Sequence, residues 1–176
     1  MGLMDILQQY QHPGAVSDSH ADSHAVSAHF DEVARTVPAG EVGNGVAEAF
    51  KSDQTPPFGE MVAQLFGQSN PQQRAGVLSQ LLTSVGPAML SGFGGGALAK
   101  VFGQANAGAS EVTPSQAAQV TPAQVEAMAT HAEHNDPGVV DRIGEFYSAH
   151  PGLVKTLGTA ALTIALAAIA GRRGSQ

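Results

Sequence analysis

Apolar residues recur along much of the chain at the spacing of one face of an α-helix. Two such stripes are well defined, and they consist of Val26, Phe30, Val33 and Val37, and of Phe58, Met61, Val62, Leu65 and Phe66. Intervals of three and four residues place side chains on the same side of a helix, where they can be buried together. Alternating β-branched residues with hairpin turns, the pattern of strands, are nearly lacking. The sequence therefore predicts an all-α protein, a bundle of several helices.

Many prolines stand where helices are expected to begin. Five of them follow a residue that commonly caps helices, in the pairs Thr55-Pro56, Asn70-Pro71, Thr113-Pro114, Thr121-Pro122 and Asp136-Pro137. The first residue can accept a hydrogen bond from a free backbone amide, and proline at the first helical position loses no helical bond. Glutamines three residues after Thr113 and Thr121 complete capping boxes. These pairs predict five helix starts.

Glycine-rich stretches interrupt the helical pattern twice. The first holds Gly40, Gly43 and Gly45. Because glycine in a helix interior is unfavourable, we expect a helix only after these three residues. The second stretch, residues 87–103, is apolar but rich in glycine, and it fits either a loop with a short helix or a close helix crossing built on small residues.

The pattern suggests five consecutive regions. They are a helical N-terminal region at 1–103, a linker at 104–111, a helical hairpin region at 112–151, an apolar helix at 152–171 and a basic tail at 172–176.

The stretch 152–171 has an unusual composition. As one helix it would be about 30 Å long, which matches the hydrocarbon thickness of a bilayer. Its strongest hydrophobes point in several directions, and they are Leu157, Leu162, Ile164, Leu166 and Ile169. A helix that is apolar all round must be enclosed by protein or by lipid. We therefore expect these residues to mediate oligomerisation or membrane contact, or to be buried within the fold. Its length and the basic pair Arg172-Arg173 favour a membrane anchor, whereas its many Ala, Gly and Thr residues insert only marginally into a bilayer.

Charge and composition narrow the functional classes. The formal net charge is −7, and the eight Lys and Arg residues are scattered, so no nucleic-acid partner is expected. The lack of cysteine excludes disulfides, thiolate catalysis and cysteine-based zinc sites. The first ten residues carry neither a basic segment nor a long apolar run, so no secretory signal peptide is expected.

The histidines are the one group of closely spaced residues that could form a chemical site. His20 and His24 are four residues apart, and His131 and His134 are three apart, so each pair can share a helix face and hold a metal ion. The alternative is that all four are exposed polar positions. No metalloprotease, nucleophile-elbow or phosphate-loop motif occurs, so we expect neither an enzyme nor a cofactor.

Three segments carry a resemblance to a known family. They are the opening Met1-Gly-Leu-Met-Asp-Ile-Leu7, the stretch Gln72-Gln-Arg-Ala-Gly-Val-Leu-Ser-Gln-Leu-Leu82 and the glycine-rich residues 92–97. Within about the first hundred residues the chain resembles the YidB-type family of uncharacterised bacterial proteins. The resemblance implies a small helical bacterial protein and supplies no catalytic residues.

Three functional hypotheses follow. The first is a non-enzymatic, self-associating helical protein, a homo-oligomer assembled through its apolar C-terminal helix in the cytoplasm or at the inner membrane. The second is a soluble, monomeric helical binding module in which that helix is an internal core element. The third is a metal-binding protein that uses the four histidines.

Overall fold

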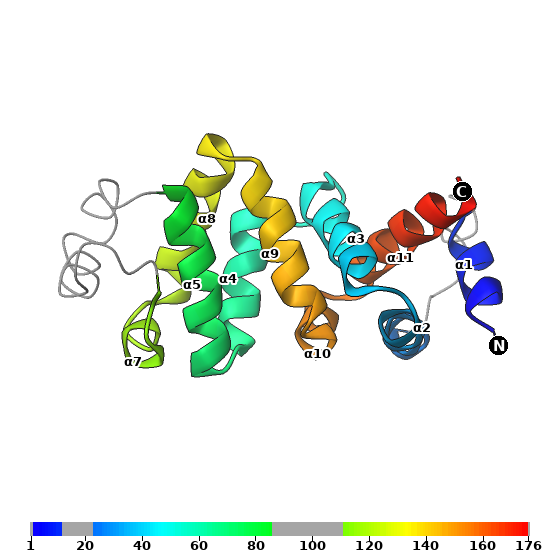
Figure 1. Cartoon of the computed structure of the whole chain (residues 1–176), viewed down its shortest axis with the longest axis horizontal. Helices are drawn as coiled ribbons and strands as arrows, with labels where there is room; N and C mark the ends of the chain where they lie inside the picture. Colours follow the sequence, from blue (N-terminus) through cyan, green and yellow to red (C-terminus); the bar gives the residue numbers. More distant parts are fainter. Residues whose placement is uncertain (1, 12–22, 86–110, 176) are drawn as a thin grey trace. The chain divides into compact units, whose positions relative to one another are not determined.

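The computed structural model describes residues 2–11, 23–85 and 111–175, and Figure 1 labels their helices. All regular elements in these ranges are helical, which confirms the all-α prediction. In chain order they are α1 (Leu3–Gln11), α2 (Ser23–Thr36), α3 (Ala39–Lys51), α4 (Phe58–Gln68), α5 (Pro71–Val85), α7 (Pro114–Ala117), α8 (Pro122–Asn135), α9 (Gly138–Ser148), α10 (Pro151–Val154), the 3-10 helix η2 (Lys155–Leu157) and α11 (Thr159–Gly174).

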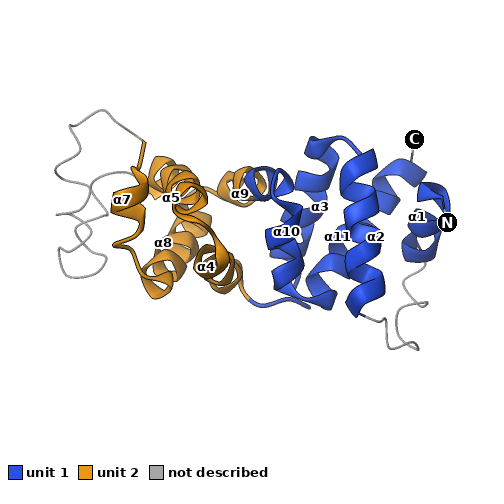
Figure 2. Cartoon of the chain, turned by 90° about the horizontal axis from the view of Figure 1, so that it is seen from below, with its two compact units in different colours: residues 1–56, 144–176 blue, residues 57–143 orange. Residues whose placement is uncertain are grey.

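The helices form two compact units, coloured separately in Figure 2. Unit 1 combines residues 1–56 with residues 144–176, and unit 2 consists of residues 57–143. These boundaries differ from those that the sequence suggests, because unit 1 is built from the two ends of the chain. Residues 104–110 of the linker expected at 104–111 lie outside the described residues, as does the glycine-rich stretch 87–103.

Helix α11 is the central element of unit 1. It packs most extensively against α3, and also against α1 and α2 (Figure 2). Six of its side chains are at most 1% exposed, namely Ala161, Leu162, Ala165, Leu166, Ile169 and Ala170. Apolar area removed from water is the main favourable contribution to folding, so α11 is a major part of this unit's core.

The stretch 152–171 is not one helix, contrary to the expectation from its composition. The chain forms α10 and η2 first, and α11 begins only at Thr159. Gly158 separates the two parts with a φ of 93°, a left-handed backbone that favours glycine. With 16 residues, α11 is about 24 Å long. Within the described ranges, none of the helices combines the length and the hydropathy needed to cross a bilayer.

Helices α4 and α8 form the most extensive helix packing in unit 2, and α5 packs against α7 and α8. The stripe predicted from Phe58 to Phe66 is buried in α4, and the stripe from Val26 to Val37 is likewise buried in unit 1. Both stripe predictions are therefore confirmed.

Four of the five predicted helix starts are found. Thr113 and Thr121 each form a complete capping box with the glutamine three residues later. Asn70 Oδ1 accepts a 2.9 Å hydrogen bond from the amide of Gln73, whose side chain accepts one of 2.9 Å from the amide of Asn70. Asp136 Oδ1 accepts a 3.1 Å hydrogen bond from the amide of Gly138, where α9 begins.

The start predicted at Thr55 is wrong. Helix α4 begins at Phe58, directly after Pro57, and Pro57 provides no side-chain cap. The hydroxyl of Thr55 instead donates hydrogen bonds of 2.6 Å to Ala49 O and 3.0 Å to Ser52 O. Thr55 therefore bonds carbonyls at the C-terminal end of α3, where helical donors run out and Ala49 O otherwise accepts a long, 3.4 Å bond from the amide of Ser52.

Candidate functional site

The residues predicted to mediate assembly divide into two groups. Leu162, Leu166 and Ile169 are at most 1% exposed within unit 1. Leu157 in η2 and Ile164 in α11 are half-buried. The three buried side chains are therefore enclosed by their own chain, and two of the five keep part of their surface accessible.

Glycines allow α3 to approach its neighbours closely. A Cβ built on Gly45 would lie 2.7 Å from the carbonyl oxygen of Ala165 in α11. Two residues earlier in α3, a Cβ on Gly43 would lie 2.8 Å from the Cα of Glu145 in α9. Atoms do not pack at such distances, so both contacts require glycine. The helix that was expected only after these glycines in fact begins at Ala39, because α11 and the C-terminal half of α9 pack against them.

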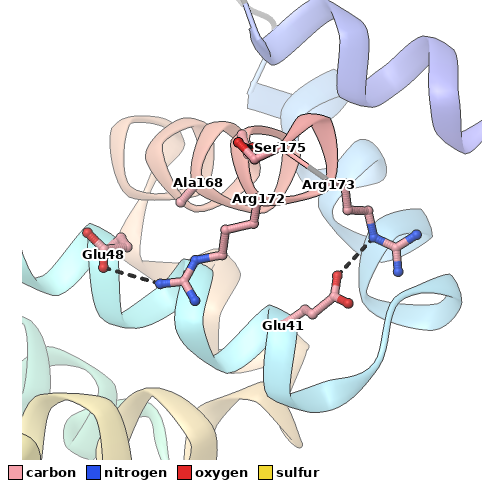
Figure 3. Close-up of a pocket in the computed structure, with 7 residues that line it drawn as sticks. Glu41, Glu48, Ala168, Arg172, Arg173 and Ser175 are labelled. Atoms are coloured by element: carbon pink, nitrogen blue, oxygen red, sulfur yellow. Dashed lines mark hydrogen bonds and ion pairs between the residues drawn. The ribbon is translucent and has the colours of Figure 1, made fainter.

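A surface hollow of about 650 Å³ lies beside the α3–α11 contact. Ala168 and Gly171 of α11 are small residues of its lining, and Ser175 also lines it; Figure 3 labels Ala168 and Ser175. Its charged walls come from Glu41 and Glu48 of α3 and from Arg172 and Arg173 of α11. We call this feature the α3–α11 hollow.

The two arginines of the α3–α11 hollow are held differently. Arg173 Nε donates a 2.8 Å hydrogen bond to Glu41 Oε2. A terminal nitrogen of Arg172 lies 3.6 Å from Glu48 Oε1, an ion pair beyond hydrogen-bond distance (Figure 3). Both arginines stand in the last turn of α11, where positive charge also favours the helix dipole. These pairs could not be predicted from the sequence, because the partners are far apart along the chain.

The predicted histidine ligands are spread over two units and one undescribed segment. His24 is exposed on α2 in unit 1, and His131 and His134 lie on α8 in unit 2. His20 lies outside the described residues. Among residues 2–11, 23–85 and 111–175, no three His, Asp or Glu side chains are arranged to hold a metal ion.

His131 and His134 share a second hollow of about 500 Å³ along α8, with Glu126 and Thr130 among its walls. His134 Nδ1 lies 2.7 Å from the carbonyl oxygen of Thr130. Because a carbonyl only accepts, Nδ1 carries the proton and Nε2 is the nitrogen with the lone pair in the neutral ring. Within the described structure, this pair would supply two protein ligands, His131 and His134. A metal site there stays a prediction.

Unit 2 contains a charged contact that the sequence did not suggest. Arg142 of α9 donates to Asp136 Oδ2 at 2.5 Å and also bonds the hydroxyl of Ser84 at the end of α5. The Arg142 guanidinium holds the pKa of the Asp136 carboxyl below its ordinary value. This contact ties the start of α9 to the end of α5.

In unit 1, an aromatic contact ties α1 to α2. The hydroxyl of Tyr10 lies 3.0 Å from His29 Nδ1, and the two rings meet edge to face. Burial raises the pKa of the Tyr10 hydroxyl. The contact joins α1 to α2 within unit 1.

Comparisons of the chain with protein-family models, with curated proteins and with solved structures found no match. The resemblance to the YidB-type family therefore stays a prediction.

Proposed function

We propose that the chain is a non-enzymatic, monomeric helical binding module in which α11 is an internal core element. The observation that supports this proposal best is the burial of Leu162, Leu166 and Ile169 by helices of the same chain. Apolar surface that is already removed from water contributes nothing further when a second copy or a lipid approaches.

The free-energy cost of exposing buried side chains favours the monomeric binding module over assembly through the whole apolar face of α11. Exposing one fully buried Leu or Ile side chain costs roughly 1.5–3 kcal/mol. Releasing three such residues would therefore consume a large part of the 5–15 kcal/mol or so by which a typical domain is stable. Assembly by extraction of α11 would require the partner to replace all of these contacts.

We assign the binding surface of the module to the α3–α11 hollow. It is concave, and both helices that form it are fixed by buried packing on their opposite sides. Binding groups on rigid helices keep their geometry better than groups on loops. Its four charged side chains offer hydrogen-bond donors and acceptors at the surface of unit 1.

The particle mass in solution tests the proposal. Light scattering during size-exclusion chromatography, with and without mild detergent, should give the 17.9 kDa of one chain in both cases. A larger particle in the absence of detergent, reduced to one chain by Ile164→Glu, would contradict the proposal. Ala25→Glu, at an exposed position of α2, is the control for the single added negative charge.

Self-association is the second candidate, and the half-buried Leu157 and Ile164 are the observation that favours it. In that case Leu157 and Ile164 form the contact between copies, and the three buried residues of the five predicted do not take part. Location in the cytoplasm or at the inner membrane stays a prediction, and fractionation of cells that express the chain tests it.

A further inference from the structure

Arg172 keeps its hydrogen-bonding capacity in the described structure. Its guanidinium makes no hydrogen bond to the described residues, and its ion pair with Glu48 spans 3.6 Å. The two side chains are 49% and 44% exposed, so their attraction is screened by water. Arg172 is therefore positioned over the α3–α11 hollow by a weak contact that a better acceptor can replace.

Arg173 provides the contrast within the same hollow. Its Nε is hydrogen-bonded to Glu41 at 2.8 Å, a charge-assisted bond of ordinary strength. This bond fixes the side chain against α3, as Figure 3 shows. Arg172 is thus the exchangeable cation of the hollow, and Arg173 is the structural one.

The shape of the hollow leaves space beside Arg172. Ala168 and Gly171 lie one turn and one residue before it on α11, and neither has a side chain longer than a methyl group. A planar guanidinium binds best to a group that offers two oxygens in one plane, as carboxylates and phosphates do. Such a group replaces one long ion pair by two parallel hydrogen bonds.

We propose that the α3–α11 hollow binds an oxyanion group, a carboxylate or phosphate of a small ligand, through Arg172. Glu48 is the internal competitor that occupies Arg172 when no ligand is bound. This inference rests on the proposed function in one respect, since α11 must be packed in unit 1 for the hollow to exist. The net charge of −7 weakens general attraction of anions, so binding depends on this local site.

The test uses the full chain and two simple probes, sodium acetate and sodium phosphate, which replace sodium chloride at constant ionic strength. Nuclear magnetic resonance follows the backbone amides of Gly171 and Ser175, which line the hollow. We expect saturable shifts with at least one probe, and the more effective probe identifies the preferred oxyanion.

Two substitutions should act in opposite directions. Arg172→Ala should abolish saturation, and Glu48→Gln should lower the half-saturating concentration by roughly two- to five-fold, the effect of one surface ion pair. Arg35→Ala, on α2 and away from the hollow, is the matched control and should change nothing.

Amide shifts that rise linearly with probe concentration, without saturation, would overturn the inference. Identical titration curves for Arg172→Ala, Glu48→Gln and Arg35→Ala would also overturn it. The mass of the same samples is measured by light scattering. A one-chain particle without saturable shifts contradicts the oxyanion site alone, whereas a multimer contradicts the proposed function.

Discussion

Gly45 of α3 lies so close to Ile169 of α11 that a Cβ on the glycine would be 2.7 Å from Ile169 Cγ1. The sequence singles out each residue by itself, Gly45 as unfavourable inside a helix and Ile169 as a strong hydrophobe of 152–171, but it does not indicate their contact. Their contact joins helices from opposite ends of the chain, and it lies at the most extensive helix packing of unit 1. The position of α11 within its own chain depends on this approach.

Replacing Gly45 by alanine should therefore destabilise unit 1. The added methyl group would have to displace Ile169 and the carbonyl of Ala165, and such overpacking costs about 1–3 kcal/mol. Urea denaturation followed by circular dichroism measures the loss. Gly40→Ala is the matched control, because its Cβ would meet nothing within 4 Å, and its stability should be unchanged or slightly higher.

The same reasoning applies to unit 2 at the crossing of α4 and α8. A Cβ on Gly59 would lie 2.2 Å from Thr130 Oγ1 and 2.8 Å from the carbonyl oxygen of Glu126. Because one of these atoms belongs to the backbone, Gly59→Ala should lower the urea midpoint even when it is combined with Thr130→Ala. Gly67→Ala, in the same helix, would meet only Pro122 Cγ at 4.0 Å. Equal stability of the Gly59 and Gly67 variants would disprove the close crossing.

Two isoleucines of α11 provide a matched pair for its burial. Ile169→Ala should cost about 2–5 kcal/mol, because the side chain is fully buried and its loss leaves a cavity. Ile164→Ala should cost clearly less, since Ile164 is half-buried. The difference in the free energy of unfolding between the two variants is the quantity to measure. A larger loss at Ile164 would indicate that the face of α11 assigned to the core is instead the accessible one.

Acid should weaken the contact between Asp136 and Arg142. The folded state holds the pKa of Asp136 below its ordinary value, so the unfolded state takes up the proton first as the pH falls. The contribution to stability is therefore complete above the ordinary carboxyl pKa of about 3.9. It is lost as the pH falls through the lower pKa of the folded state. Comparing urea midpoints between pH 6 and pH 2 for the parent chain and Asp136→Asn isolates the effect.

The variant should show a smaller pH dependence than the parent, and its stability should be lower mainly at pH 6. Asp53→Asn, at an exposed position of unit 1, serves as the control and should follow the parent. Identical profiles for the parent and Asp136→Asn would show that the ion pair contributes nothing to stability.

Local features of the fold could be predicted from the sequence. Helix stripes such as Phe58 to Phe66 and the caps at Thr113 and Thr121 depend on residues a few positions apart. The helix start predicted at Thr55 is wrong because two prolines follow this residue. The helix begins after the second, Pro57, which has no side chain that could cap it. Whether a threonine caps the following helix or the preceding one depends on the path of the chain between them.

Contacts between distant segments could not be predicted. Gly43 and Gly45 indicated a weak helix, whereas their small size is needed for packing against α9 and α11. Arg172 and Arg173 suggested the boundary of a membrane segment, and in the structure they pair with Glu48 and Glu41 of α3. The α3–α11 hollow exists only because these two helices meet, so no local pattern could reveal it.

Amide hydrogen exchange of α11 in the intact chain tests the central claim most directly. At a low micromolar concentration at which light scattering gives the mass of one chain, amides of Ala161 to Ala170 should exchange as slowly as those of the buried part of α3. Their rates should not depend on protein concentration or on detergent. Fast exchange in the monomer, with protection gained only on association or on addition of detergent, would contradict a core role for α11.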